Sequence, residues 1–182
     1  RKMVTDITSL QSAYFPSAAT GFVCGSNAAD AGSNVLRTTN SGTSWSTLFT
    51  TAANANEVYF LNTSTGWISC DEGKVYRTTN SGTNWSEIST PVTVNLNSVH
   101  FYDASTGYVC GDSGKVLKST NGGLNWSMQI SGTTETLNSV HFGSAVYGCA
   151  AGNNGSRIIT TNGGINWINQ NDISGVNLYS VF

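Results

Sequence analysis

The sequence is poor in charged residues and in proline, and it has no long hydrophobic run. Only 10% of its 182 residues are Asp, Glu, Lys or Arg, and its formal net charge at pH 7 is −2. Nucleic-acid-binding proteins normally carry a basic excess that neutralises phosphates, so this balance argues against that class. No apolar stretch approaches the roughly 18 residues of a membrane span, and no secretory signal peptide is visible. We therefore expect neither a nucleic-acid partner nor a membrane span in this segment.

Small polar residues dominate instead, because nearly half of the chain is Ser, Thr, Asn or Gly. A disordered linker can have that composition, but five Trp, seven Tyr and seven Phe supply packing anchors that linkers lack. The composition indicates a β-rich, turn-rich globular protein of the kind common outside cells. We expect an extracellular or cell-surface location after export, with the periplasm as a second option.

The chain is built from repeats with a period of 41 residues. The string LNSVHF occurs at residues 96–101 and again at 137–142. Each unit reads as four short strands separated by turn residues, and no segment has a sustained helical period. Such a period with four strands per unit is typical of a β-propeller blade.

The sequence thus predicts an all-β fold, a β-propeller of four-stranded antiparallel blades. Residues 178–182 repeat the first strand of the third unit, so we expect four blades plus the opening strand of a fifth. A closed four-bladed ring with a tail is the alternative. Because the chain starts with Arg1 rather than Met, we also expect a piece of a longer protein. The expected blades span about 7–49, 55–90, 95–131 and 136–172, and the fifth begins at about 175–182.

The best-defined motif is the turn between the third and fourth strands of each unit. Its hydroxyl and amide side chains can fold back onto backbone groups, its Gly accepts a positive φ, and its Trp can fill the gap between blades. We call it the box turn. Its residues are Thr38, Asn40, Gly42 and Trp45; Thr78, Asn80, Gly82 and Trp85; Ser119, Asn121, Gly123 and Trp126; and Thr160, Asn162, Gly164 and Trp167.

The box turn resembles the Asp-box, or bacterial neuraminidase repeat, of the form Ser/Thr-x-Asp-x-Gly-x-x-Trp. The longer unit at residues 98–126 is similar to the repeat of photosystem II stability and assembly factor-like propellers, and this likeness covers essentially the whole chain. One departure is consistent: Asn stands at each Asp position. The resemblance implies that the box is a fold element away from the working face. Similar repeats occur in secreted multi-domain bacterial proteins.

Asp-box propellers include sialidases and related glycoside hydrolases, so that chemistry is an alternative function. A sialidase-type site needs three converging arginines, a Tyr/Glu pair and a further acid. Here Arg37 and Arg77 share one repeat position, which Lys118 fills in the third unit. This pattern favours a row on a solvated strand face, and most acidic residues fall in predicted turns. We therefore assign no catalytic residue, and a sialidase-like or endo-glucanase-like enzyme remains the alternative.

Cysteine and histidine do not form a metal-binding pattern, so no metal or cofactor is expected. One Cys per unit is a poor zinc arrangement, and small buried side chains are the expected role. A disulfide between adjacent blades, such as Cys110 with Cys149, is the alternative. A shared repeat position near the central channel carries Tyr14, Tyr59, His100 and His141.

These observations favour a non-enzymatic binding or structural module of an exported bacterial protein. Its partner would be a protein or a surface glycan within a larger assembly, recognised at variable loops such as 26–34 and 131–136. An assembly chaperone is a second alternative, and it predicts a basic patch. Weak candidates for ligand binding are Arg37, Arg77, Lys118, Tyr14, Tyr59, His100 and His141.

Overall fold

The structure is a computed structural model that describes residues 7–27, 32–170 and 175–182. The described strands form four antiparallel sheets of four strands each. Blade 1 contains β1 (Ile7–Tyr14), β2 (Gly21–Asn27), β3 (Ser33–Thr38) and β4 (Ser46–Thr50). Blade 2 contains β5 (Ala55–Phe60), β6 (Gly66–Cys70), β7 (Val75–Thr78) and β8 (Ser86–Ile88). Blade 3 contains β9 (Leu96–Phe101), β10 (Gly107–Gly111), β11 (Val116–Ser119) and β12 (Ser127–Gln129). Blade 4 contains β13 (Leu137–Phe142), β14 (Gly148–Gly152), β15 (Arg157–Thr160) and β16 (Ile168–Asn169).

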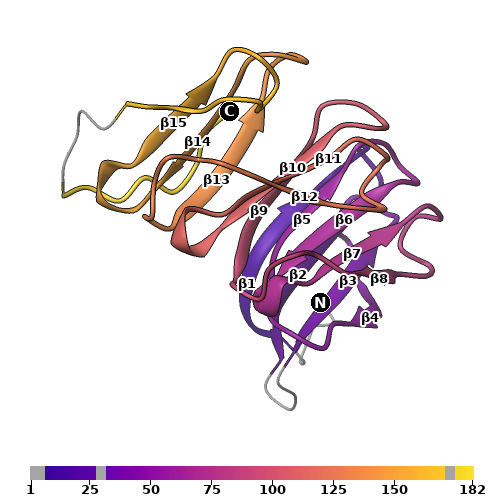
Figure 1. The fold of residues 1–182 in the computed structure, drawn as a ribbon. Coiled ribbons are helices and arrows are strands. Elements are labelled where there is room, and N and C mark those ends of the chain that lie inside the picture. Colours follow the sequence, from indigo (N-terminus) through magenta and orange to yellow (C-terminus); the bar gives the residue numbers. More distant parts are fainter. Residues whose placement is uncertain (1–6, 28–31, 171–174) are drawn as a thin grey trace.

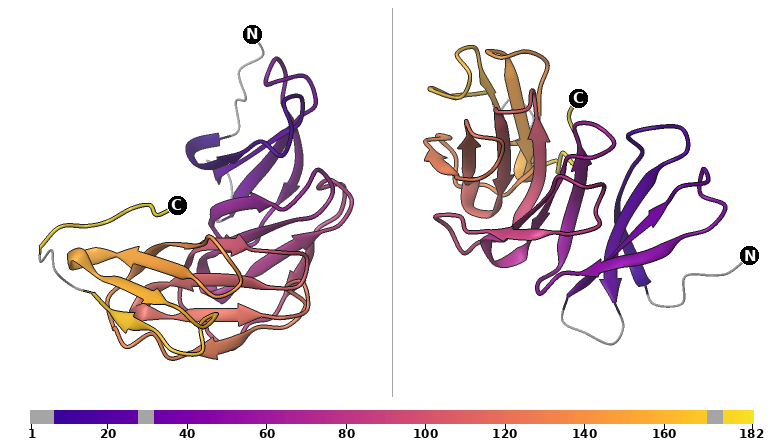
Figure 2. Two further views of the ribbon diagram at one scale, coloured as in Figure 1. Left: turned by 90° about the horizontal axis from the view of Figure 1, so that it is seen from above. Right: turned by 90° about the vertical axis from the view of Figure 1, so that its right-hand side faces the viewer.

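The four sheets follow one another along an open arc (Figures 1 and 2). The first strand of each blade contacts the first strand of the next, so β1, β5, β9 and β13 lie side by side. This arrangement confirms the all-β propeller expected from the repeats. Blades 1 and 4 lie at opposite ends of the arc, so the structure does not form the closed four-bladed ring.

Helical structure is limited to three single 3₁₀ turns among the described residues. They are η1 (Asp71–Gly73), η2 (Asp112–Gly114) and η3 (Asn153–Gly155), each between the second and third strands of its blade. The middle residue of each has a positive φ, between 53° and 60°. The described residues contain no helix with the length and apolarity that a membrane span requires.

Each described blade interface contains a cluster of three aromatic rings. Trp67 of blade 2 stacks on Phe101 of blade 3 with centroids 3.5 Å apart, and Trp126 meets Phe101 edge-on at 5.8 Å. Offset-stacked and edge-on rings are the favoured aromatic geometries. The other two interfaces repeat the cluster, as Phe22, Phe60 and Trp85 and as Tyr108, Phe142 and Trp167.

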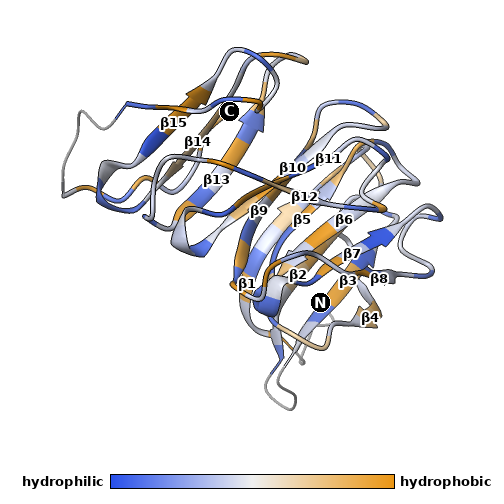
Figure 3. Cartoon of the chain, in the orientation of Figure 1, coloured by the Kyte–Doolittle hydropathy of each residue, from blue (hydrophilic) through white to orange (hydrophobic). Residues whose placement is uncertain are grey.

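The ring stack depends on a glycine beneath each phenylalanine. A Cβ atom at Gly107 would lie 2.4 Å from the ring of Phe101, closer than any real contact. Gly148 has the same relation to Phe142. The second strand of a blade therefore starts with Gly because the ring needs that space. Figure 3 shows the accompanying pattern, in which hydrophobic segments concentrate in the strands.

Hydrogen bonds along the inner strands join successive blades in a repeating ladder. Asn97 donates from Nδ2 to the carbonyl oxygen of Leu137 at 2.9 Å, and the Val140 N–H donates to Ser98 Oγ at 3.2 Å. These bonds satisfy polar groups that the blade interface would otherwise bury without partners.

The C-terminal segment continues this ladder in the place of a fifth first strand. Asn138 donates to the carbonyl oxygen of Leu178 at 2.8 Å, and the Val181 N–H donates to Ser139 Oγ at 3.2 Å. Both bonds are those of blades 3 and 4, shifted by one repeat. The fold is thus four blades plus the opening segment of a fifth.

We expect Trp126→Ala to lower the free energy of unfolding by about 3–5 kcal/mol, because it leaves a cavity against Phe101. Guanidinium denaturation measures the loss. The matched control is Trp45→Ala, because among the described residues the one aromatic ring that Trp45 contacts is Phe15, which is itself 49% exposed. We expect that control to cost about 1–2 kcal/mol. Equal losses in the two variants would contradict the packing role of the three-ring cluster.

Candidate functional site

The box turns are closed by side-chain hydrogen bonds, as the third one illustrates. Ser119 Oγ accepts the Gly123 N–H at 2.8 Å and donates to Asn121 Oδ1 at 3.0 Å. Asn121 Oδ1 also accepts the Asn125 N–H at 2.9 Å. The same three bonds recur in the other box turns, around Asn40, Asn80 and Asn162. The amide oxygen accepts the bonds that a carboxylate oxygen could accept, which explains why Asn can stand at the Asp position.

The three cations of the predicted row each bind the box turn of the next blade. Arg37 Nη1 donates to Ser81 O at 2.9 Å, and Arg77 Nε donates to Gly122 O at 2.8 Å. Lys118 Nζ donates to Gly163 O at 2.6 Å. The sequence suggested a solvated row, but these half-buried side chains join neighbouring blades. Blade 4 has Ile159 at this position, so its outer face lacks the cation.

Beside Arg77 and Lys118, an aromatic side chain with a polar hydrogen reinforces this contact. Trp67 Nε1 donates to the carbonyl oxygen of Gly122 at 3.1 Å, and the Tyr108 hydroxyl donates to that of Gly163 at 2.9 Å. The Gly122 and Gly163 carbonyl oxygens therefore each accept two donors from the preceding blade. Blade 4 has Cys149 where blades 2 and 3 have these aromatic donors.

The four ring residues near the inner strands form a continuous row. Ring centroids lie 5.2 Å apart for Tyr14 and Tyr59, 5.3 Å for Tyr59 and His100, and 4.4 Å for His100 and His141. All four are half-buried. Burial, followed by the nearby His141, lowers the pKa of His100 from 6.5 to about 4. His100 therefore packs as a neutral ring at pH 7.

The cysteines make no disulfide among themselves. All four are free, with Cys24, Cys70 and Cys110 buried and Cys149 half-buried. Burial raises the pKa of each thiol. The Cys110–Cys149 bridge is thus not formed, and three of the four act as small core residues. The described residues also hold no group of three or more His, Cys, Asp or Glu side chains placed to bind a metal ion.

Glu57 is the notable residue that sequence reasoning missed. It lies on β5 at the ladder position that Ser98 and Ser139 fill in later blades, and its Oε2 accepts the Val99 N–H at 2.7 Å. Burial raises the pKa of its carboxyl group. The signal was present in the repeat alignment, because a lone carboxylate replaces a hydroxyl at this position.

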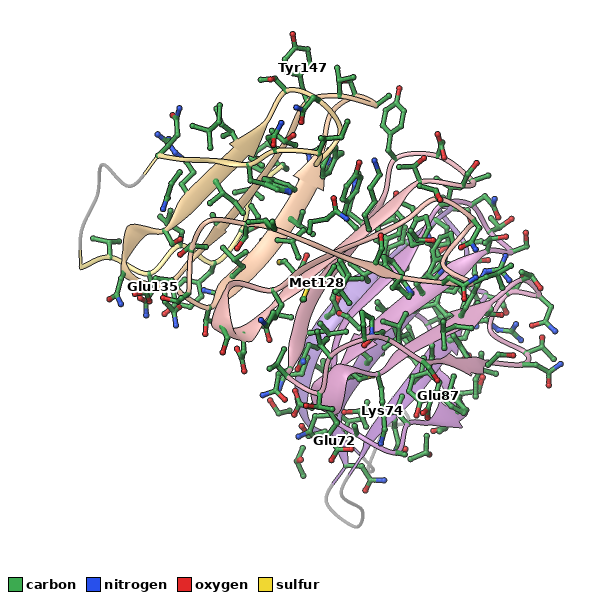
Figure 4. The ribbon with its side chains drawn as sticks, in the orientation of Figure 1. Glu72, Lys74, Glu87, Met128, Glu135 and Tyr147 are labelled. Carbon is green, nitrogen blue, oxygen red and sulfur yellow. The ribbon has the colours of Figure 1, made fainter. Side chains whose placement is uncertain are left out.

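The described carboxylates all have partners in the structure. Figure 4 shows Glu72 beside Lys74, with which it forms a salt bridge of 2.8 Å. Glu87 Oε2 accepts the Tyr76 hydroxyl proton at 2.8 Å. The remaining pairs are Asp71 with Asn54 and Asn56, Asp103 with the Ser105 and Thr106 N–H groups, Asp112 with Asn97 and Thr136, and Glu135 with Asn154. Asp6, Asp30 and Asp172 lie outside the described residues.

Comparison with known proteins identifies both a family and structural relatives. The model of a family described as photosynthesis system II assembly factor YCF48 matches residues 78–171. The structure titled YCF48 bound to D1 peptide has a TM-score of 0.73 and 14% identity, over 97% of this chain and 58% of that chain. The present chain therefore spans less than two thirds of that relative. No curated protein sequence matches the chain.

Two glycoside hydrolases share the fold. The GH74 enzyme of Niastella koreensis has a TM-score of 0.70 and 16% identity, over 88% of this chain and 30% of that chain. The GH74 xyloglucanase from Xanthomonas campestris has a TM-score of 0.71 and 13% identity, over 94% of this chain and 33% of that chain. At these identities the likeness concerns the fold alone.

Replacing the box amide tests whether its oxygen matters more than its charge. Asn121→Asp keeps the acceptor for Ser119 and Asn125, so we expect stability within about 0.5 kcal/mol of the parent at pH 7. Asn121→Ala removes the acceptor and should cost about 1–2 kcal/mol. Urea denaturation of both variants measures the difference. A large loss in the Asp variant would show that the site requires a neutral side chain.

The lowered pKa of His100 predicts a pH-dependent stability. The unfolded ring takes up a proton near pH 6.5 and the folded ring only near pH 4. The contribution of His100 is therefore complete above that upper value and is lost as the pH falls toward the lower one. We expect a loss of about 1–3 kcal/mol across this range, and less in His100→Phe. Denaturation at several pH values measures it, and an unchanged slope in the variant would contradict the assignment.

Proposed function

Because the chain belongs to the photosynthesis system II assembly factor YCF48 family, we propose that it is a non-enzymatic β-propeller module that binds a segment of another protein. Support comes from the relative of the same fold whose title describes a bound D1 peptide. From that likeness the proposal takes only the class of ligand, a peptide. The module would belong to an exported bacterial protein at the cell surface, as the low charge and turn-rich composition suggest.

The observation that carries the non-enzymatic part is the engagement of the described carboxylates. A glycoside hydrolase needs two carboxyl groups that flank the scissile bond, one of them able to donate a proton. Glu57 is the described acid with a raised pKa, yet its Oε2 accepts a backbone N–H inside the blade ladder. Asp71 and Asp112 begin 3₁₀ turns and accept hydrogen bonds from neighbouring side chains. These carboxylates support the fold.

The basic residues of the predicted row also support the fold. Arg37, Arg77 and Lys118 use their donors on box-turn carbonyl groups, so they form no open basic face for an anionic ligand. Recognition then falls to the links between blades and to exposed side chains of the rim. An assembly chaperone that holds a protein segment fits this surface as well, since it needs the same kind of contact.

The second candidate function is glycoside hydrolysis, which the GH74 relatives favour. A related candidate is the binding of a surface glycan without its hydrolysis. Both would draw on residues beyond the described ones, because the present chain covers 30% and 33% of those two enzymes.

The test combines a turnover assay with a binding assay on the same preparation. We expect no release of reducing sugar from xyloglucan or of sialic acid from sialyllactose above the buffer rate, and saturable binding of extended peptides. Glu57→Gln is the variant for the one described acid with a raised pKa. Turnover that this variant abolishes would overturn the non-enzymatic proposal and favour the hydrolase.

A further inference from the structure

A groove of about 700 Å³ lies on the outer side of blade 3. Its walls are β12, the edge strand of its sheet, and the link at residues 131–135 that leads to blade 4. Lys115 and Glu135 line it, together with the exposed apolar side chains of Met128 (56% exposed) and Ile130 (87% exposed). Figure 4 shows Met128 and Glu135, which come from the strand and the link respectively.

Comparison with the preceding repeat explains why a groove opens here. In blade 2 the equivalent positions carry Ile88 and Val92, which pack against the hydrophobic core. In blade 3 they are Gln129 and Thr133, and both line the groove. The link itself is ordered, because Ser131 Oγ accepts the Thr133 N–H and Thr133 Oγ1 accepts the Glu135 N–H. A polar residue at the end of β12, Gln129, and one in the link, Thr133, thus replace the apolar side chains that cover the core in blade 2.

The same repeat comparison singles out one cation. Lys74 of blade 2 forms a salt bridge with Glu72 at 2.8 Å. Its equivalent in blade 3 is Lys115, but the acid is replaced by Ser113. Within the described part of the chain, the Lys115 ammonium group has no hydrogen-bond or ion-pair partner. Blade 3 therefore has the lysine without its acidic partner, and this lysine, Lys115, lines the groove.

The acid in the groove does not take the place of that partner. Glu135 Oε2 accepts a hydrogen bond from Asn154 Nδ2 at 2.9 Å and makes no salt bridge with Lys115. The Lys115 ammonium group is therefore open to a ligand, whereas the Glu135 carboxylate is already hydrogen-bonded to Asn154. An occupant with a carboxylate near Lys115, and no second carboxylate near Glu135, would complement both.

The lining also favours a peptide over a sugar. None of the described lining residues carries an aromatic ring on which a sugar could stack. Hydroxyl and amide groups line it instead, beside β12, the edge strand of its sheet. The Gln129 amide group donates to the Ser127 and Met128 carbonyl oxygens at 3.4 and 3.2 Å, and an added strand that pairs with this edge would displace that side chain. Met128 and Ile130 supply apolar contact area for the side chains of such a strand.

We propose that this groove binds an extended acidic peptide of a partner protein along the edge of β12, with a carboxylate of the peptide on Lys115. The site rests on the proposed function, since it specifies where that protein segment binds and what charge it carries. The link at 131–135 would be the recognition loop, and blade 2 would lack the site because Glu72 neutralises Lys74.

The test starts with selection from a phage-displayed library of random peptides of about twelve residues. The immobilised protein is expected to enrich peptides that combine Asp or Glu with apolar residues, and Lys115→Gln should lose that acidic preference. One enriched peptide is then synthesised with its acid, and with the corresponding amide. Free and amidated C-terminal forms of each separate a side-chain carboxylate from a terminal one.

Fluorescence polarisation of these labelled peptides measures the effect of single charges. Lys115→Gln is expected to weaken binding of the acidic peptide about fivefold, the range of an exposed ion pair. Lys74→Gln is the matched control at the same repeat position, and we expect it to leave affinity unchanged within about twofold. The amide form of the peptide should bind the parent and Lys115→Gln equally.

The outcomes separate this inference from the proposed function. Enrichment of no peptide at all would overturn both. Enriched peptides without acidic preference, or binding that Lys115→Gln leaves intact, would overturn the blade 3 site while peptide binding stands. An equal loss in Lys74→Gln and Lys115→Gln would show a general charge effect and would also overturn the site.

Discussion

A ring from the second strand of one blade, stacked on the phenylalanine that ends the first strand of the next, is the contact on which the structure depends. A four-stranded sheet of this size has two faces to cover, and only a neighbouring sheet can cover them. Trp67 on Phe101 and Tyr108 on Phe142 do so with centroids 3.5 Å apart. The stack requires a glycine beneath each phenylalanine ring, and a tryptophan of the box turn packs edge-on against the same phenylalanine.

The same interface determines what the polar residues do. Since the blades touch face to face, turn carbonyl groups at the interface need donors, and Arg77 together with the Trp67 indole supplies two for Gly122. Charged side chains that look available in the sequence are therefore used inside the molecule. A chain with so few charges leaves little for electrostatic recognition of ligands, so a single unpaired charge carries more weight.

Differences between repeats are thus more informative about function than the repeats themselves. A feature that recurs in each blade supports the fold, whereas a position where one blade departs has been released from that role. Blade 3 departs at its rim, where Ser113 replaces the partner of Lys115 and Thr133 replaces an apolar residue. Blade 4 departs on its outer face, where Cys149 and Ile159 replace the aromatic and cationic donors. That face accordingly lacks the donors with which blades 2 and 3 bind the box turn of the next blade.

The period, the strand count and the box turns were all accessible from the sequence, because each depends on residues within one unit. Gly, Asn and hydroxyl residues at fixed offsets define a turn locally, as the bonds around Asn121 illustrate. The partners of Arg37 and Glu57 were not accessible, since they lie 44 and 42 residues away in the next blade. Only the stacking of blades brings such residues together. The sequence by itself determined the blade, and the tertiary structure decided which side chains the blades use on each other and which remain for a partner.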